Sequence, residues 1–161
     1  MKKVLSLFAV FFAFVFLISC GAKTGEETAT KAEAPKKVAI VYSTGGKGDK
    51  SFNDSAYAGL QRAMKDFGVE VAEYEPKDAS VEIRNQLAEY AQDGTYDLIM
   101  TIGFTSVDPL TSVAKEYPNQ KFVLIDDAIE GLPNVLSVSY KEQEGTFLTG
   151  ALAALMSKTN K

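Results

Sequence analysis

Short apolar runs alternate along this sequence with segments of helical periodicity, and this alternation constrains the fold more than any other feature. Most of the runs are rich in Val, Ile and Leu, as expected for strands that are buried on both faces. Helices that connect such strands predict a parallel sheet flanked by helices, an α/β fold of the Rossmann-like kind. The predicted strands are residues 38–42, 69–72, 98–102, 122–125 and 135–138.

Four helices are predicted between and after these strands. The first follows Ser51, a suitable N-cap residue, and ends at Gly68. The second ends at Gly94, and the third covers about residues 106–116. The last helix begins near residue 142, and we expect its apolar face to be buried. That face consists of Phe147, Leu148, Ala151, Leu152 and Leu155.

The N-terminal residues resemble a bacterial export signal. Two lysines precede an apolar run over residues 4–18, which is shorter than the roughly 20 residues of a membrane-spanning helix. The run ends in Leu17-Ile18-Ser19-Cys20, which resembles a lipobox, the sequence that directs acylation of its cysteine. The alternative is an ordinary secretory signal with a chance cysteine.

Three expectations follow from the lipobox. Residues 1–19 are removed as a signal peptide, and Cys20 is lipidated. Residues 20–37 are dominated by Gly, Ala, Thr, Lys and Glu, and they form a flexible tether. The chain is then anchored to the bacterial cell membrane and faces the periplasm or the exterior.

Residue types that are scarce in the sequence count against several classes of function. There is no histidine, which is the commonest general base and metal ligand, and there is one cysteine. The formal net charge is −4, and no cluster of Lys and Arg forms a basic stripe after the signal peptide. We therefore expect no enzyme activity, no metal, no cofactor and no nucleic-acid partner.

Ligands of such sheets bind beyond the carboxyl ends of the strands, so the loops there are the candidate site. The loop after the first strand nearly matches the dinucleotide fingerprint G-x-G-x-x-G, with Gly46 and Gly48 in place. Glu73 lies at about the spacing of a ribose-binding acid. However, Ser51 replaces the third glycine, and Asp49 brings a negative charge to the expected pyrophosphate position. The match therefore favours a dinucleotide only weakly.

An aromatic residue and an amide, Phe52 and Asn53, begin the first predicted helix at this edge. The Phe52 ring is suited to stacking on a flat ligand, and Asn53 can donate to and accept from the edge of a base. The alternative for Phe52 is a place in the core.

Further candidates follow the third and fourth predicted strands or end the first one. Asp126 and Asp127 come directly after a strand and are expected either to bind hydroxyl or N–H groups of a ligand or to cap a turn. Tyr42 and Phe104 either shape a pocket or serve packing.

Three segments together resemble the basic membrane protein family. They are GGKGDKSFND at residues 45–54, FVLID at residues 122–126 and EQEGTFLTGALAA at residues 142–154. Members of this family are lipoprotein solute-binding components of ABC importers, and they include purine nucleoside receptors of spirochaetes and Gram-positive bacteria. The resemblance extends from Lys37 to the end of the chain.

The resemblance implies one lobe of a type I periplasmic-binding-protein fold that binds a purine nucleoside in a cleft between two lobes and delivers it to an ABC permease. It implies a stacking aromatic at Phe52, a neighbouring amide at Asn53 and a nucleoside-binding carboxylate at Asp126. Ser43 stands where nucleoside receptors of the family often have an acid, which leaves room for another solute.

The resemblance also implies that residues 38–161 are the N-terminal lobe without the second lobe, either as a fragment or as a half that a partner chain completes. One wall buries less of a ligand than the roughly 70–90% that is typical, so we expect the isolated chain to bind weakly or not at all. The alternatives are a receptor for a sugar or another small solute, an exported nucleoside-processing enzyme, and an adhesin or structural lipoprotein.

Overall fold

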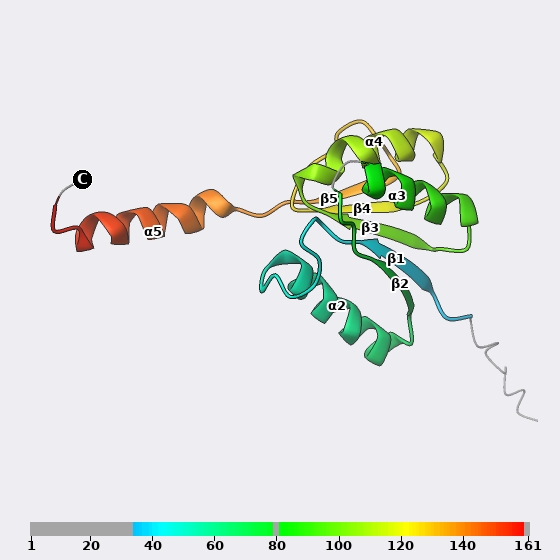
Figure 1. The fold of residues 1–161 in the computed structure, drawn as a ribbon, viewed down its shortest axis with the longest axis horizontal. Coiled ribbons are helices and arrows are strands. Elements are labelled where there is room, and N and C mark those ends of the chain that lie inside the picture. The colour runs from blue at the N-terminus through cyan, green and yellow to red at the C-terminus, as the bar shows by residue number, and fades with distance from the viewer. Residues whose placement is uncertain (1–33, 79–80, 160–161) are drawn as a thin grey trace, which may run out of the picture. The chain divides into compact units, whose positions relative to one another are not determined.

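A computed structural model describes residues 34–78 and 81–159. Its five strands form a parallel sheet in the order β2-β1-β3-β4-β5 (Figure 1), which confirms the predicted α/β fold. The predicted signal peptide, Cys20 and most of the predicted tether lie outside the described residues. The strands are β1 (Lys37–Val41), β2 (Glu70–Tyr74), β3 (Leu98–Ile102), β4 (Phe122–Ile125) and β5 (Val135–Val138).

The first strand begins one residue earlier than the apolar run predicts. Lys37 pairs with Glu70 of β2, and its backbone N–H donates to the Asp97 carboxylate at 2.9 Å. These two contacts extend the strand into the end of the predicted tether.

Helices cover both faces of the sheet (Figure 1). One face packs on α2 (Phe52–Phe67), and the opposite face packs on α3 (Val81–Asp93) and α4 (Val107–Glu116). A short 3₁₀ turn, η1 (Phe104–Ser106), connects β3 to α4. The chain ends in α5 (Glu142–Met156).

The core is divided by the sheet because side chains alternate along each strand. In β1, Ala39 packs towards α3 and α4, whereas Ile40 packs towards α2, and both are completely buried. Tyr42, directly after β1, is also completely buried on the α2 side. Tyr42 therefore serves packing, which was one of its two predicted roles.

The prediction that α5 buries an apolar face is wrong for the described chain. No residue of α5 is buried, and the exposed fractions are 73% for Phe147, 57% for Leu152 and 85% for Leu155. The helix begins only a few residues after the edge strand β5. It has no extensive contact with another helix or strand among the described residues. The apolar pattern predicts a helix face that packs against another surface, but it does not identify that surface.

No helix among the described residues is both long enough and apolar enough to cross a membrane.

Candidate ligand-binding site

The carboxyl ends of the strands bring three predicted loops to one edge of the sheet. The backbone N–H of Gly103, after β3, donates to Ile125 O at 2.7 Å. A Cβ atom at Gly103 would lie 3.7 Å from the Cβ atom of Ser43, which follows β1. The backbone N–H of Asp126, after β4, donates to Val138 O at 2.7 Å. The loops after β1, β3 and β4 thus converge as the topology predicts.

The loop between β1 and α2 is built around glycines in the left-handed region. Gly45, Gly46 and Gly48 have φ values of 112°, 61° and 99°, which residues with side chains rarely adopt. A Cβ atom at Gly46 would meet the Glu75 carboxylate, which is the end of a flexible side chain and can move. The loop therefore favours glycine because of its backbone conformation.

Acidic side chains occupy the N-terminus of α2. The Asp49 carboxylate accepts from the backbone N–H groups of Ser51, Asn53 and Asp54 at 2.8–3.1 Å. Desolvation alone would raise the pKa of Asp49, but these hydrogen bonds hold it below its ordinary value. Ser51 precedes the helix as predicted, although its side chain makes no capping hydrogen bond. The Asp49 carboxylate thus takes the place that the pyrophosphate of a dinucleotide would need.

Asn53 points into the loop, and only 1% of it is exposed. Its Oδ1 accepts from the backbone N–H and from the hydroxyl of Ser43, both at 3.1 Å. Its Nδ2 donates to Gly46 O at 3.0 Å. These contacts occupy both lone pairs of Oδ1 and one N–H of Nδ2, so in this structure the amide joins the residue after β1 to the glycine loop and α2.

Phe52 lies on the solvent side of the same helical turn. It is 42% exposed, so it is not a core residue, and its ring centroid lies 6.2 Å from that of Tyr140 at an interplanar angle of 42°. Tyr140 is 51% exposed and follows β5. Phe104, in η1 after β3, is exposed as well. Aromatic rings are therefore available after three of the strands.

Tyr140 was missed by the sequence analysis. It lies two residues beyond the last residue of β5, Val138, at the same edge of the sheet as Ser43 and Asp126. The rule that ligands bind beyond the carboxyl ends of parallel strands applies to the fifth predicted strand as well, and it would have identified this residue.

Asp126 has a strained backbone and a half-buried side chain. Its φ of 73° is unusual for a residue other than glycine. Desolvation, together with the charges of Glu142 and Asp127, raises the pKa of its carboxyl group. Asp127 accepts from the N–H of Ala128 at 2.7 Å and so caps the turn, whereas no hydrogen bond to the Asp126 side chain is found among the described residues. Asp127 therefore takes the capping role, whereas ligand binding by Asp126 stays a prediction.

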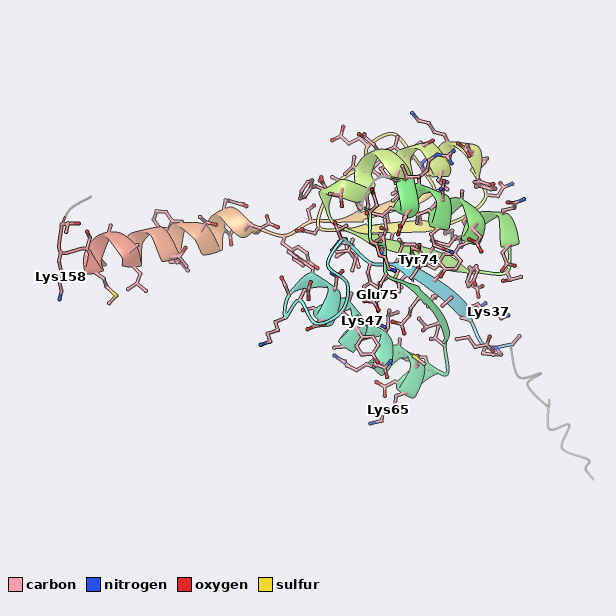
Figure 2. The ribbon with its side chains drawn as sticks, viewed as in Figure 1. Lys37, Lys47, Lys65, Tyr74, Glu75 and Lys158 are labelled. Atoms are coloured by element: carbon pink, nitrogen blue, oxygen red, sulfur yellow. The ribbon has the colours of Figure 1, made fainter. Side chains whose placement is uncertain are left out.

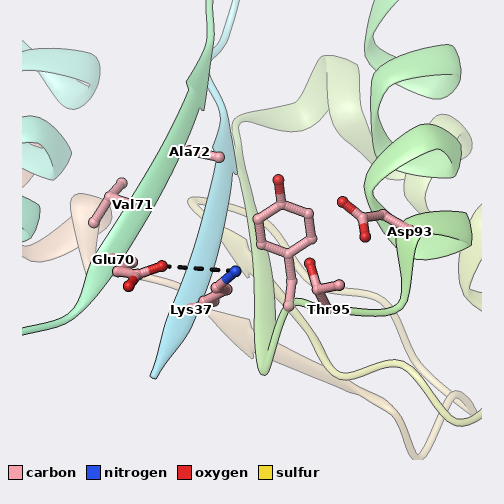
Figure 3. Close-up of a pocket in the computed structure, with 7 residues that line it drawn as sticks. Lys37, Glu70, Val71, Ala72, Asp93 and Thr95 are labelled. Carbon is pink, nitrogen blue, oxygen red and sulfur yellow. Dashed lines mark ion pairs between the residues drawn. The ribbon is translucent and has the colours of Figure 1, made fainter. Parts of the chain in front are cut away.

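Two hollows of the surface lie away from this edge. The hollow in Figure 3 has a volume of about 200 Å³ and is found at the amino ends of β1 and β2. A second, of about 350 Å³, lies beside the C-terminal ends of α3 and α4. The first is smaller than the roughly 300–1,000 Å³ of most small-molecule sites, and neither contains a predicted site residue. The first is lined by Lys37, Glu70, Val71, Ala72, Asp93, Thr95 and Tyr96.

Among the described residues, no group of three or more acidic, histidine or cysteine side chains is arranged to hold a metal ion. At the edge itself, the described side chains offer aromatic rings for stacking and a carboxylate for hydrogen bonding.

Comparison with known proteins places the chain in a family. Residues 36–161 match the family model Bmp, described as ABC transporter substrate-binding protein PnrA-like. The chain belongs to the Bmp family. The resemblance to the basic membrane protein family is thereby confirmed, and this family is one of solute-binding proteins rather than enzymes.

Individual members of the Bmp family support this assignment. An uncharacterized lipoprotein of Pyrococcus abyssi is 43% identical over 82% of this chain and 33% of its own length. The ABC transporter nucleoside-binding protein BmpA of Lactococcus lactis is 32% identical over 99% of this chain and 46% of its own length. The chain thus spans about a third to a half of the length of these relatives.

A solved structure gives the same result for the fold. The solute-binding protein of an ABC transporter system from Aeropyrum pernix superposes with a TM-score of 0.70 and 40% sequence identity. The match covers 74% of this chain and 32% of that structure.

Proposed function

We propose that this chain is the N-terminal lobe of a lipid-anchored solute-binding component of an ABC importer, and that its solute is a purine nucleoside. The observation that carries the proposal is the pairing of an exposed ring, Phe52, with an acid, Asp126, at the same edge of a parallel sheet. A flat base can stack on the ring. The carboxylate can accept hydrogen bonds from sugar hydroxyls or from N–H groups of the base.

The electrostatics of Asp126 support its role as a ligand contact. Its carboxylate lies near two other acids, Asp127 and Glu142, which disfavour its charge. Donor groups of a solute would relieve this repulsion and would replace the water that burial removes. A strained backbone at such a residue is typical of sites where position matters more than stability.

The remaining features of the proposal concern location and partners. Acylated Cys20 would anchor the chain to the cell membrane, with the sheet facing the periplasm or the exterior, and a permease would receive the solute. The lipoprotein name of the relative from Pyrococcus abyssi supports the anchor. The edge loops form one wall, so we propose that tight binding requires a second lobe and that the present chain binds at millimolar concentrations.

Saturation-transfer NMR tests this proposal because it detects weak binding. The full chain is mixed with purine nucleosides, pyrimidine nucleosides and sugars, each at millimolar concentration. We expect saturation to reach the base protons of purine nucleosides. Transfer to sugars alone would favour the sugar receptor, and no transfer to any solute from a folded chain would contradict nucleoside recognition by this lobe.

Replacing Phe52 with Ala is expected to weaken nucleoside binding by roughly 5- to 150-fold, because base–aromatic stacking is worth about 1–3 kcal/mol. Phe67→Ala is the matched control, since Phe67 is an exposed phenylalanine at the other end of α2. Titrations followed by NMR compare the two variants. Equal affinities for both variants would show that Phe52 does not stack on the base.

Replacing Asp126 with Asn is expected to stabilise the chain at neutral pH and to weaken solute binding. The folded-state pKa of Asp126 is raised, so its protonated form is favoured by folding, and that stabilisation is lost as pH rises through the folded pKa. Asn also tolerates the left-handed backbone that Asp126 adopts. Thermal melting should show a gain for D126N at neutral pH that disappears in acid. A gain that persists in acid would point to a cause other than charge.

A further inference from the structure

Lys47 ties the glycine loop to the end of β2. Its Nζ lies 2.9 Å from Glu73 Oε2 and 3.3 Å from Glu75 Oε1. Its backbone N–H donates to Glu75 Oε2 at 2.8 Å. Figure 2 labels Lys47 and Glu75 beside one another. The loop is therefore held to one acidic residue through both the backbone and the side chain of Lys47.

The ammonium group of Lys47 has several partners in the protein. Besides the two carboxylates, it lies 4.9 Å from the ring centroid of Tyr57 and 5.5 Å from that of Tyr42. Hydrogen bonds to Glu73 are the largest cause that raises the pKa of Lys47, and Tyr42 donates to the same Glu73 oxygen at 2.7 Å. Glu73 therefore holds the Lys47 ammonium and the Tyr42 hydroxyl together.

The contacts of Lys47 lead step by step to Phe52. Lys47 follows Gly46, whose carbonyl accepts from the Asn53 side chain at 3.0 Å and whose backbone lies against Glu75. Asn53 is buried and is adjacent to Phe52 at the start of α2. A shift of the loop at residues 46–47 would therefore move the turn that presents the Phe52 ring.

We propose that Lys47 is a positioning residue for Phe52: held by Glu73 and Glu75, it selects one conformation of the glycine loop and so fixes the ring at the edge of the sheet. The inference rests on the proposed function, in which Phe52 stacks on the solute. The loop needs such a device because three of its residues are glycines with positive φ and would otherwise sample many conformations. The ion pairs are partly exposed and contribute little to global stability.

The test uses two readouts that need no solute. Lys47→Met keeps the aliphatic stem and removes the ammonium, and Lys50→Met is the matched control, because Lys50 is an exposed lysine of the same loop. In K47M we expect amide exchange of residues 45–51 to rise roughly tenfold, as for a loss of about 1.4 kcal/mol of local stability. NMR contacts between the Phe52 and Tyr140 rings should weaken, while the melting temperature stays close to that of the wild type. Lys47→Arg should restore both readouts.

Several results would overturn the proposal. Unchanged loop exchange and ring contacts in K47M would do so, and so would a uniform loss of protection throughout the sheet, which indicates a merely structural role. If K47M does not fold, Glu75→Gln tests the same ion pairs, since it removes a charge that pairs with Lys47. In nucleoside titrations, K47M should bind roughly three- to tenfold more weakly than K50M. Changed loop exchange and ring contacts in K47M, without nucleoside binding by any variant, would support the positioning role of Lys47 and contradict the proposed function.

Discussion

Replacing Leu110 with Ala is expected to lower the free energy of unfolding by about 2–5 kcal/mol, whereas the same replacement at Leu152 should change it by less than about 0.5 kcal/mol. Leu110 lies on α4 and is completely buried in the core, so its truncation leaves a cavity. Leu152 lies on α5 and is 57% exposed. Both are leucines within helices, so helix propensity affects the two variants alike.

Urea denaturation of the two variants measures this difference directly. The comparison also tests whether α5 stays uncovered in solution. A loss for Leu152→Ala as large as that for Leu110→Ala would mean that α5 packs on another surface, either of the same chain or of a second copy.

Asn53→Ala is the second variant with a large expected effect, a loss of roughly 2–4 kcal/mol of unfolding free energy in the absence of any solute. Truncation leaves the backbone N–H of Ser43 and the carbonyl of Gly46 without their partner. Unsatisfied buried groups of this kind cost about 1–3 kcal/mol each. Asn119→Ala is the control, since Asn119 is exposed.

The same variant separates two roles for Asn53. A large loss of stability without solute supports a positioning role, in agreement with the 1% exposure of the residue. Normal stability combined with lost nucleoside affinity would instead support the direct ligand contact that the family resemblance implies. Denaturation and NMR titration of Asn53→Ala and Asn119→Ala distinguish these outcomes.

The sheet was predictable because most of its strands are runs of apolar residues bounded by turn residues. Leu98–Ile102 and Val135–Val138 were located to the residue. β2 was displaced at both ends, because Glu70–Tyr74 alternates with polar residues and has a half-exposed burial pattern typical of an edge strand. The crossover rules predicted a parallel sheet, and the order of its strands comes from the structure.

The candidate site was predictable in position but not in the direction of its side chains. Phe52 and Asn53 were expected to face the ligand together, but consecutive residues of a helix point about 100° apart. The structure turns Asn53 inward and Phe52 outward. Glu73, which matches the spacing of a ribose-binding acid, instead pairs with Lys47 and Tyr42, because β2 lies beside β1. Such tertiary contacts leave no local signal in a single sequence.

The apolar residues of α5 show a different limit. Phe147 and Leu152 have the spacing of a buried helix face, yet 73% and 57% of them are exposed. Periodicity predicts that one face of a helix is apolar, but it does not predict which surface packs against that face.

The order of the strands also determines when the sheet can assemble during synthesis. β1 is the first strand to be made and lies between β2 and β3, so its second neighbour arrives only with Leu98, the partner of Val38. Until then the strand has an open edge and the core on both sides of it is incomplete. Contacts this distant in sequence make folding slow compared with that of a helical bundle of similar size. The centre of the sheet therefore cannot form until synthesis has passed β3.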